Sequence, residues 1–290
     1  MRNPEHAFLS ELSEKLEKEK LEKALYERAQ EVFRVNPPLD PKDFKGVPGY
    51  TDEEIDADIK NVHDKERRFN KEHTPAQKEQ KKFAKMLEAM LNELIELHDW
   101  LGPYAETITT SDYDDIVNGV DMVVEFQDEE KKSASHLALA IDVTFASDIG
   151  KKIDRIKEEI RNGGLSRIKY FASEFLEHPG ELVDIPRVII GADVDTIKNL
   201  GTLWLAEDKK ALAVHEMQKV VLEEVRIQLE VFAKYARAKN QKRVAETYEE
   251  TLQIVQEILQ NKEDISIDTL LRDRVFGAIT REANHLQREI

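Results

Sequence analysis

The spacing of apolar residues predicts long helices at both ends of the chain. Residues 4–34 carry an apolar stripe among Glu/Lys pairs, formed by Leu9, Leu12, Leu16, Leu21, Leu25 and Val32. Thr51 followed by Glu54 is a capping-box pattern, which predicts a polar helix to about residue 71. Thr74-Pro75 predicts the start of a third helix, which ends near Gly102-Pro103. From about residue 207 to the end, the pattern predicts three more helical segments, parted near residues 240 and 261.

The middle of the chain has the period of β-strands. In HLALAIDVTFA the apolar Leu137, Leu139, Ile141, Val143 and Phe145 alternate with Ala138, Ala140, Asp142 and Thr144. Asn118-Gly119 separates DYDDIV from VDMVVEF, which predicts a two-residue β-hairpin. A helix from Ser147 to Gly163-Gly164 should follow, and SRIKYFAS and PRVIIGAD should form two further strands.

This order of elements predicts an α/β protein. We expect a small mixed sheet with flanking helices, embedded between N- and C-terminal helical segments. The expected division is an N-terminal helical arm at 1–79, an α/β core at 80–206 and a C-terminal helical segment at 207–290.

Composition narrows the functional classes. The 290 residues include 43 Lys+Arg, 59 Asp+Glu and no Cys, which excludes disulfides, zinc–thiolate sites and a cysteine nucleophile. No apolar run approaches the ~18 residues of a membrane-spanning helix, and residues 1–18 lack a signal-peptide core. We therefore expect a cytoplasmic protein with no membrane partner.

The formal charge of −16 argues against loose, charge-driven nucleic-acid binding unless basic residues gather locally. They gather in three stretches. Residues 60–85 carry nine basic and four acidic residues, residues 151–169 carry seven and three, and residues 234–243 carry five basic residues and no acid. Such stretches beside a carboxylate site would suit a phosphodiester substrate.

Two aspartates are the strongest candidates for chemistry. Asp121 follows the Asn118-Gly119 turn, and Asp142 lies in an otherwise apolar strand, where an unpaired carboxylate would be costly to bury. Carboxylates on adjacent strands supply the oxygen ligands that Mg²⁺ or Mn²⁺ prefers. Glu93 lies at the edge of the apolar stripe of the third helix and could add another carboxylate.

Other acids lie before the expected turn. Acidic side chains near turns are usually solvated, and we expect this of Asp112, Asp114 and Asp115. Asp115 has the strongest functional claim of the three, as a neighbour of Asp121 across the expected hairpin.

The order of a helix with Glu, a hairpin with Gly119-Val120-Asp121, the strand IDVT and a Lys-bearing helix resembles the PD-(D/E)XK, or restriction-endonuclease-like, nuclease superfamily. The resemblance covers roughly residues 80–192. It implies that Asp121 and Asp142 bind Mg²⁺ or Mn²⁺, that Glu93 supports a second ion or a water, and that water attacks a phosphodiester bond directly. It also implies a nucleic-acid substrate, DNA in most of the family.

The chain departs from the family pattern at one position. Thr144 stands where the family has the lysine that orients or activates the attacking water. Since that lysine varies in position within the family, the resemblance allows Lys151 or Lys152, at the start of the next helix, to serve instead; Lys152 is our candidate.

Two other interpretations stay open. Thr144 and the amphipathic terminal helices also fit a catalytically inactive nuclease-like scaffold or interaction protein, whose helices could pack on a second copy of the chain as a homodimer. An acidic helical adaptor without a metal would follow if the middle segment formed no sheet.

Overall fold

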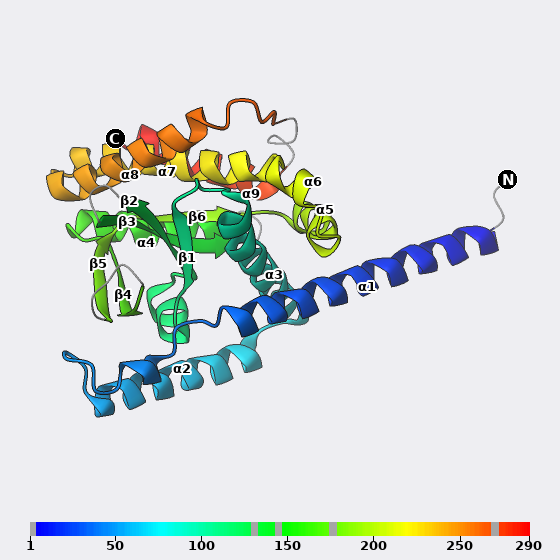
Figure 1. Cartoon of the computed structure of the whole chain (residues 1–290), viewed down its shortest axis with the longest axis horizontal. Coiled ribbons are helices and arrows are strands. Elements are labelled where there is room, and N and C mark those ends of the chain that lie inside the picture. Colours follow the sequence, from blue (N-terminus) through cyan, green and yellow to red (C-terminus); the bar gives the residue numbers. More distant parts are fainter. Residues whose placement is uncertain (1–3, 129–132, 143–146, 174–178, 268–272) are drawn as a thin grey trace.

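A computed structural model describes residues 4–128, 133–142, 147–173, 179–267 and 273–290 of the protein (Figure 1). The helices are α1 (Pro4–Val35), α2 (Asp52–Glu72), α3 (Pro75–His98), α4 (Ser147–Arg161), α5 (Val194–Leu205), α6 (Lys209–Ala213), α7 (Met217–Ala238), α8 (Lys242–Gln260) and α9 (Arg274–Arg288). The strands are β1 (Ala105–Thr109), β2 (Met122–Asp128), β3 (Ser133–Asp142), β4 (Ser166–Phe171), β5 (Gly180–Ile185) and β6 (Arg187–Gly191). A short 3-10 turn, η1 (Pro41–Phe44), and a π-helical turn, η2 (Asp114–Asn118), complete the described elements.

The strands form two small sheets. The larger sheet has the order β1-β2-β3-β6, in which β3 and β6 run parallel and the other neighbours antiparallel. Strands β4 and β5 form a separate antiparallel pair. The protein is therefore a mixed α/β fold with small sheets and flanking helices, as the sequence predicts at this level.

Helices enclose the larger sheet. Figure 1 shows α7 and α8 (yellow to orange) running across one side of the green sheet, while the first half of α1 (blue) extends away from the body. One hydrophobic cluster joins Leu25 of α1, Met90 of α3, Leu139 of β3 and Phe232 of α7. A smaller cluster packs Val123 of β2 against the β4–β5 pair. The N-terminal arm and the C-terminal helices thus share one core with the sheet.

Side chains of α7 satisfy backbone groups of β6. Ile189 of β6 donates its N–H to Gln228 Oε1 at 2.9 Å, and Gln228 Nε2 donates to the Ile189 carbonyl. Glu224, one turn earlier and fully buried, accepts the Gly191 N–H at 3.0 Å through Oε2. Because buried backbone groups must be paired, these two side chains replace a further strand beside β6.

Several local predictions are confirmed. Thr51 caps α2 by accepting the Glu54 N–H at 3.2 Å. Thr74 and Gln77 form the reciprocal capping box at the start of α3, with Pro75 in the first turn. Helix α4 ends at Arg161, and the predicted stop at Gly163 follows with a φ of +74°, which suits a residue without Cβ.

The predicted hairpin at Asn118-Gly119 is wrong. Residues 114–118 form η2 rather than a strand, and Gly119 ends that turn in the left-handed region with φ +69°. The partner of β2 is instead β1, which lies further back along the chain. Asn-Gly favours positive φ in both a hairpin and a helix C-terminus, so the pair alone could not distinguish them.

Among the described residues, we find no helix that is both long and apolar enough to cross a lipid bilayer.

Candidate carboxylate site

The backbone brings the chain around Asp121 next to β3. The Asp121 N–H donates to the Leu139 carbonyl at 3.0 Å, so residue 121 lies beside β3 just before β2 begins, one residue out of the register in which Met122 pairs with Leu139. Asp142 is the last residue of β3, three positions beyond Leu139 and opposite Gly191 of β6. The two predicted ligand positions therefore lie on adjacent segments near the same end of the sheet. The Asp142 side chain and the whole of Thr144 lie outside the described part of the structure.

Glu88 of α3 is a buried carboxylate on which the charge of Asp121 acts. Its side chain is only 4% exposed, and Lys85 Nζ contacts both carboxylate oxygens, at 3.0 and 2.9 Å. Burial, together with the charges of Asp121 and Asp115, raises the pKa of Glu88 to about 8, while Lys85 acts in the opposite direction. In turn, although burial opposes its charged form, the pKa of Lys85 is raised by Glu88.

Asp115 of η2 belongs to the same group. Burial and the charge of Asp121 raise its pKa to about 7, and Lys85 and Lys81 act in the opposite direction. We call Glu88, Asp115 and Asp121, with Lys85 beside them, the acidic cluster. Its carboxylates come from a helix, a helical turn and a strand end, and they repel one another in a poorly solvated place.

The segment that carries Asp115 and Asp121 is held by Asp114. Asp114 is fully buried and accepts hydrogen bonds from the Ser111 hydroxyl at 2.8 Å, from Asn118 Nδ2 at 2.6 Å and from the backbone N–H groups of Lys169 and Tyr170. The expectation that Asp114 is a solvated loop residue is therefore wrong, since its carboxylate ties η2 to β4. Asp112 is exposed as predicted, and Asp115 is half-buried.

Two arginines fix the far end of η2. Arg187 Nη1 donates to the Asn118 carbonyl at 2.5 Å and to the Gly119 carbonyl at 3.3 Å, and Arg155 Nη2 donates to the Val117 carbonyl at 3.1 Å. Arg187 also pairs with Glu159 of α4. These contacts satisfy the last carbonyls of the helical turn just before Asp121.

Gly119→Ala should destabilise the protein. A Cβ at this position would lie 2.7 Å from Arg155 Nη1, and φ +69° is costly for alanine. We expect a loss of about 1–3 kcal/mol in the free energy of unfolding, measured by urea denaturation. Gly150→Ala is the matched control, because a Cβ at this helical position meets nothing within 4 Å and should not destabilise. Equal stability of both variants would contradict this account of the turn.

Glu93 and Lys152 are placed differently from Glu88 and Lys85. Glu93 accepts hydrogen bonds from Arg28 Nη2 at 2.9 Å and from Trp204 Nε1 at 2.7 Å, so it links α3 to α1 and α5. It lies five residues beyond Glu88, about 140° around the helix at 100° per residue. Lys152 is half-buried in α4. The carboxylate of α3 that interacts electrostatically with Asp121 is thus Glu88. The sequence pattern did not predict Glu88 as a site residue.

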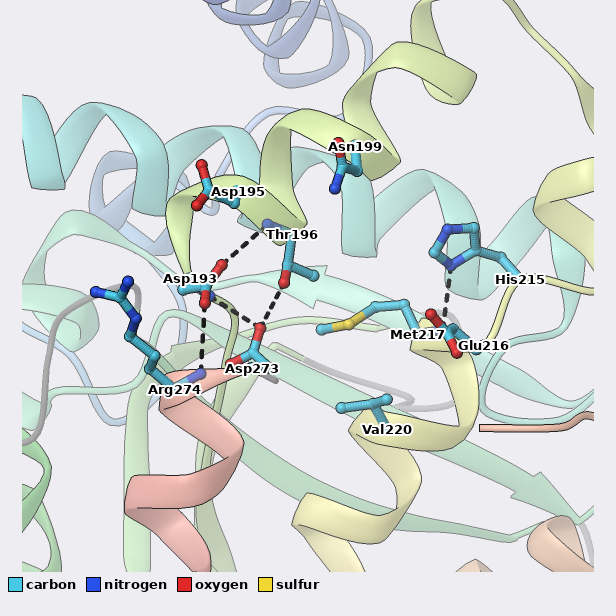
Figure 2. A pocket seen from close by; sticks show the side chains of 10 residues that line it. All are labelled: Asp193, Asp195, Thr196, Asn199, His215, Glu216, Met217, Val220, Asp273 and Arg274. Atoms are coloured by element: carbon cyan, nitrogen blue, oxygen red, sulfur yellow. Dashed lines mark hydrogen bonds between the residues drawn. The ribbon is translucent and has the colours of Figure 1, made fainter. Parts of the chain in front are cut away.

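A hollow away from the acidic cluster lies between α5, α7 and α9 (Figure 2). This cavity of about 320 Å³ is lined by several acids, including Asp193 and Asp273. Asp193 caps α5 through the Thr196 N–H at 3.0 Å, and Asp273 caps α9 through the Val275 N–H at 2.8 Å. Asp273 also accepts the Thr196 hydroxyl at 2.7 Å. Helix capping thus accounts for both of these carboxylates.

A complete metal-ligand set is not found among the described side chains: no three His, Asp or Glu residues there are grouped so that they could hold a metal ion. No protein-family model, no curated protein and no solved structure matches the chain.

Proposed function

We propose that the protein is a metal-dependent phosphodiesterase acting on nucleic acid, with a restriction-endonuclease-like core. The observation that carries this proposal is the acidic cluster, in which Glu88 and Asp115 have pKa values of about 8 and about 7 beside Asp121. Perturbed carboxyl groups with a specific charge partner are typical of functional sites. DNA is the first substrate to test, because the family resemblance favours it.

The cluster suits a hard divalent cation. Its donors are carboxylate oxygens, which Mg²⁺ and Mn²⁺ prefer. Asp121 and Asp142 would hold the ion, with Asp115 or Glu88 as further ligands, and a positive ion would relieve the carboxylate repulsion that adds to burial in raising the two pKa values. Such an ion polarises a phosphoryl oxygen and lowers the pKa of a bound water.

Lys85 could supply the positive charge that is missing at position 144, where the family has its lysine. Thr144 stands at the family's lysine position, whereas the Lys85 ammonium contacts Glu88 and interacts electrostatically with Asp115 and Asp121. We assign to Lys85 the role of orienting the attacking water or stabilising negative charge on the phosphate. It replaces Lys152 as the first lysine to test.

The second candidate function is a catalytically inactive nuclease-like scaffold. Two observations favour it: Thr144 at the lysine position, and the Lys85–Glu88 ion pair, which already neutralises one carboxylate of the cluster. Dimerisation through the terminal helices belongs to this alternative.

A nicking assay tests the activity. Supercoiled plasmid and single-stranded DNA and RNA are incubated with the full chain and Mg²⁺ or Mn²⁺, or with EDTA. We expect metal-dependent cleavage by the wild type and by Glu93→Gln, but none by Asp142→Ala. Glu93 is the matched control because it is a carboxylate of α3 with partners elsewhere. Intact substrates under all conditions, or equal cleavage by Asp142→Ala, would contradict the proposal.

A further inference from the structure

Helix α3 carries a line of lysines that ends at the acidic cluster. Lys78, Lys81, Lys85 and Glu88 are spaced by three, four and three residues, which places them along one side of the helix. Lys78 and Lys81 are exposed, and Lys85 is half-buried. Exposure thus decreases along the line toward Glu88. We call Lys78, Lys81 and Lys85 the lysine ridge.

Several basic residues of the two other basic stretches form ion pairs with acids. In the stretch 151–169, Lys169 Nζ contacts Glu54 at 2.5 Å and Asp58 at 2.6 Å. Other ion pairs of this stretch are Lys157 with Glu289 and Arg167 with Glu181. In the stretch 234–243, the pairs are Lys234 with Glu230, Arg237 with Glu249 and Arg243 with Asp184. These ion pairs neutralise part of the positive charge of the stretches 151–169 and 234–243.

The two outer lysines of the ridge differ from the paired residues named above. Within the described ranges, no ion pair to an acid is found for Lys78 or Lys81. Lys81 nevertheless lowers the pKa of Asp115, so its charge acts at the acidic cluster. In a chain with a formal charge of −16, exposed lysines aligned toward a carboxylate site are a local exception.

We propose that the lysine ridge binds consecutive phosphates of a nucleic-acid strand and guides the backbone to the acidic cluster. This inference rests on the proposed function, since it concerns how that site receives its substrate. A phosphodiester backbone fits because it presents regularly spaced negative charges, and cations that neutralise them supply most of the sequence-independent affinity. The order along α3 gives the approach: phosphates contact Lys78 and Lys81 first and reach Lys85 at the carboxylates.

Binding without catalysis provides the test. Fluorescence anisotropy measures the affinity of the metal-free full chain, in EDTA, for a labelled DNA strand and its duplex between about 50 and 200 mM salt. Lys78→Gln/Lys81→Gln removes two charges from the ridge. Lys234→Gln/Lys242→Gln removes two from the stretch 234–243 as a matched control, and circular dichroism checks folding.

We expect the ridge variant to bind about tenfold more weakly at low salt, with the slope of log K against log salt smaller by about two. The control should bind within about twofold of the wild type. The proposal would be overturned if both variants bound equally weakly, or if the ridge variant bound as tightly as the wild type. It would also be overturned if polyglutamate displaced DNA as readily as unlabelled DNA does. If DNA binding depends on the ridge but no cleavage occurs, only the proposed activity is contradicted. If the wild type cleaves DNA and the ridge variant binds it with unaltered affinity, only the proposed role of the lysine ridge is contradicted.

Discussion

Asp121→Asn should reduce metal-dependent cleavage of DNA by at least about 100-fold. The substitution keeps the shape of the side chain but removes the charge at the centre of the acidic cluster, where Asp121 acts on both Glu88 and Asp115. A neutral amide is a weaker ligand for a hard cation than a carboxylate. Initial rates of plasmid nicking with Mn²⁺ measure the effect.

Asp112→Asn is the matched control for this prediction. Asp112 is an exposed acid of the same segment, so its substitution should leave the nicking rate within about twofold of the wild type. Asp121→Asn should also remain folded, because it relieves repulsion between carboxylates. A folded Asp121→Asn protein with the full nicking rate would exclude Asp121 from the catalytic site.

Glu224→Gln should change how stability depends on pH. Glu224 is fully buried, and burial raises its pKa well above the usual 4.5, although the Gly191 N–H bond acts in the opposite direction. The folded protein therefore keeps this proton at pH values where the unfolded chain has lost it. Because the folded state binds more protons, the free energy of unfolding falls as the pH rises above about 4.5.

Glutamine keeps the acceptor for Gly191 and cannot ionise. We expect Glu224→Gln to match the wild type near pH 4.5 and to be about 1–3 kcal/mol more stable at pH 8, measured by urea denaturation. Part of the pH dependence should remain, since Glu88 and Asp115, with pKa values of about 8 and about 7, act in the same direction. Gln228→Glu is the converse variant, because it puts a second ionisable carboxyl beside β6. It should make the free energy of unfolding fall more steeply as the pH rises. Parallel pH profiles for the wild type and Glu224→Gln would contradict a buried neutral Glu224.

The helices and strands were predictable where local patterns carry the information. Capping at Thr51 and Thr74, the stop at Gly163 and the alternation through Leu137 and Leu139 are short-range features, and the structure confirms them. The prediction failed at Asn118-Gly119, because the partner of β2 depends on contacts distant in sequence. Likewise, the burial of Asp114 depends on N–H groups of β4, more than 50 residues away.

The acidic cluster was only partly predictable. Asp121 and the possible role of Asp115 could be inferred from their positions near a turn. Glu88 could not, because it lies in a run of α3 that is buried all round from Met86 to Leu91, so the apolar stripe did not show which glutamate faces the sheet. Its partner Lys85 follows from the same i, i+3 geometry once Glu88 is identified.

Calorimetric titration with Mn²⁺ tests the central claim most directly, because it measures binding at the acidic cluster independently of any substrate. We expect saturable binding by the wild type and by Glu93→Gln, and its loss in Asp121→Asn. No heat from the wild type, or equal binding by Asp121→Asn, would contradict a cation site at the acidic cluster and would leave the fold as an interaction scaffold.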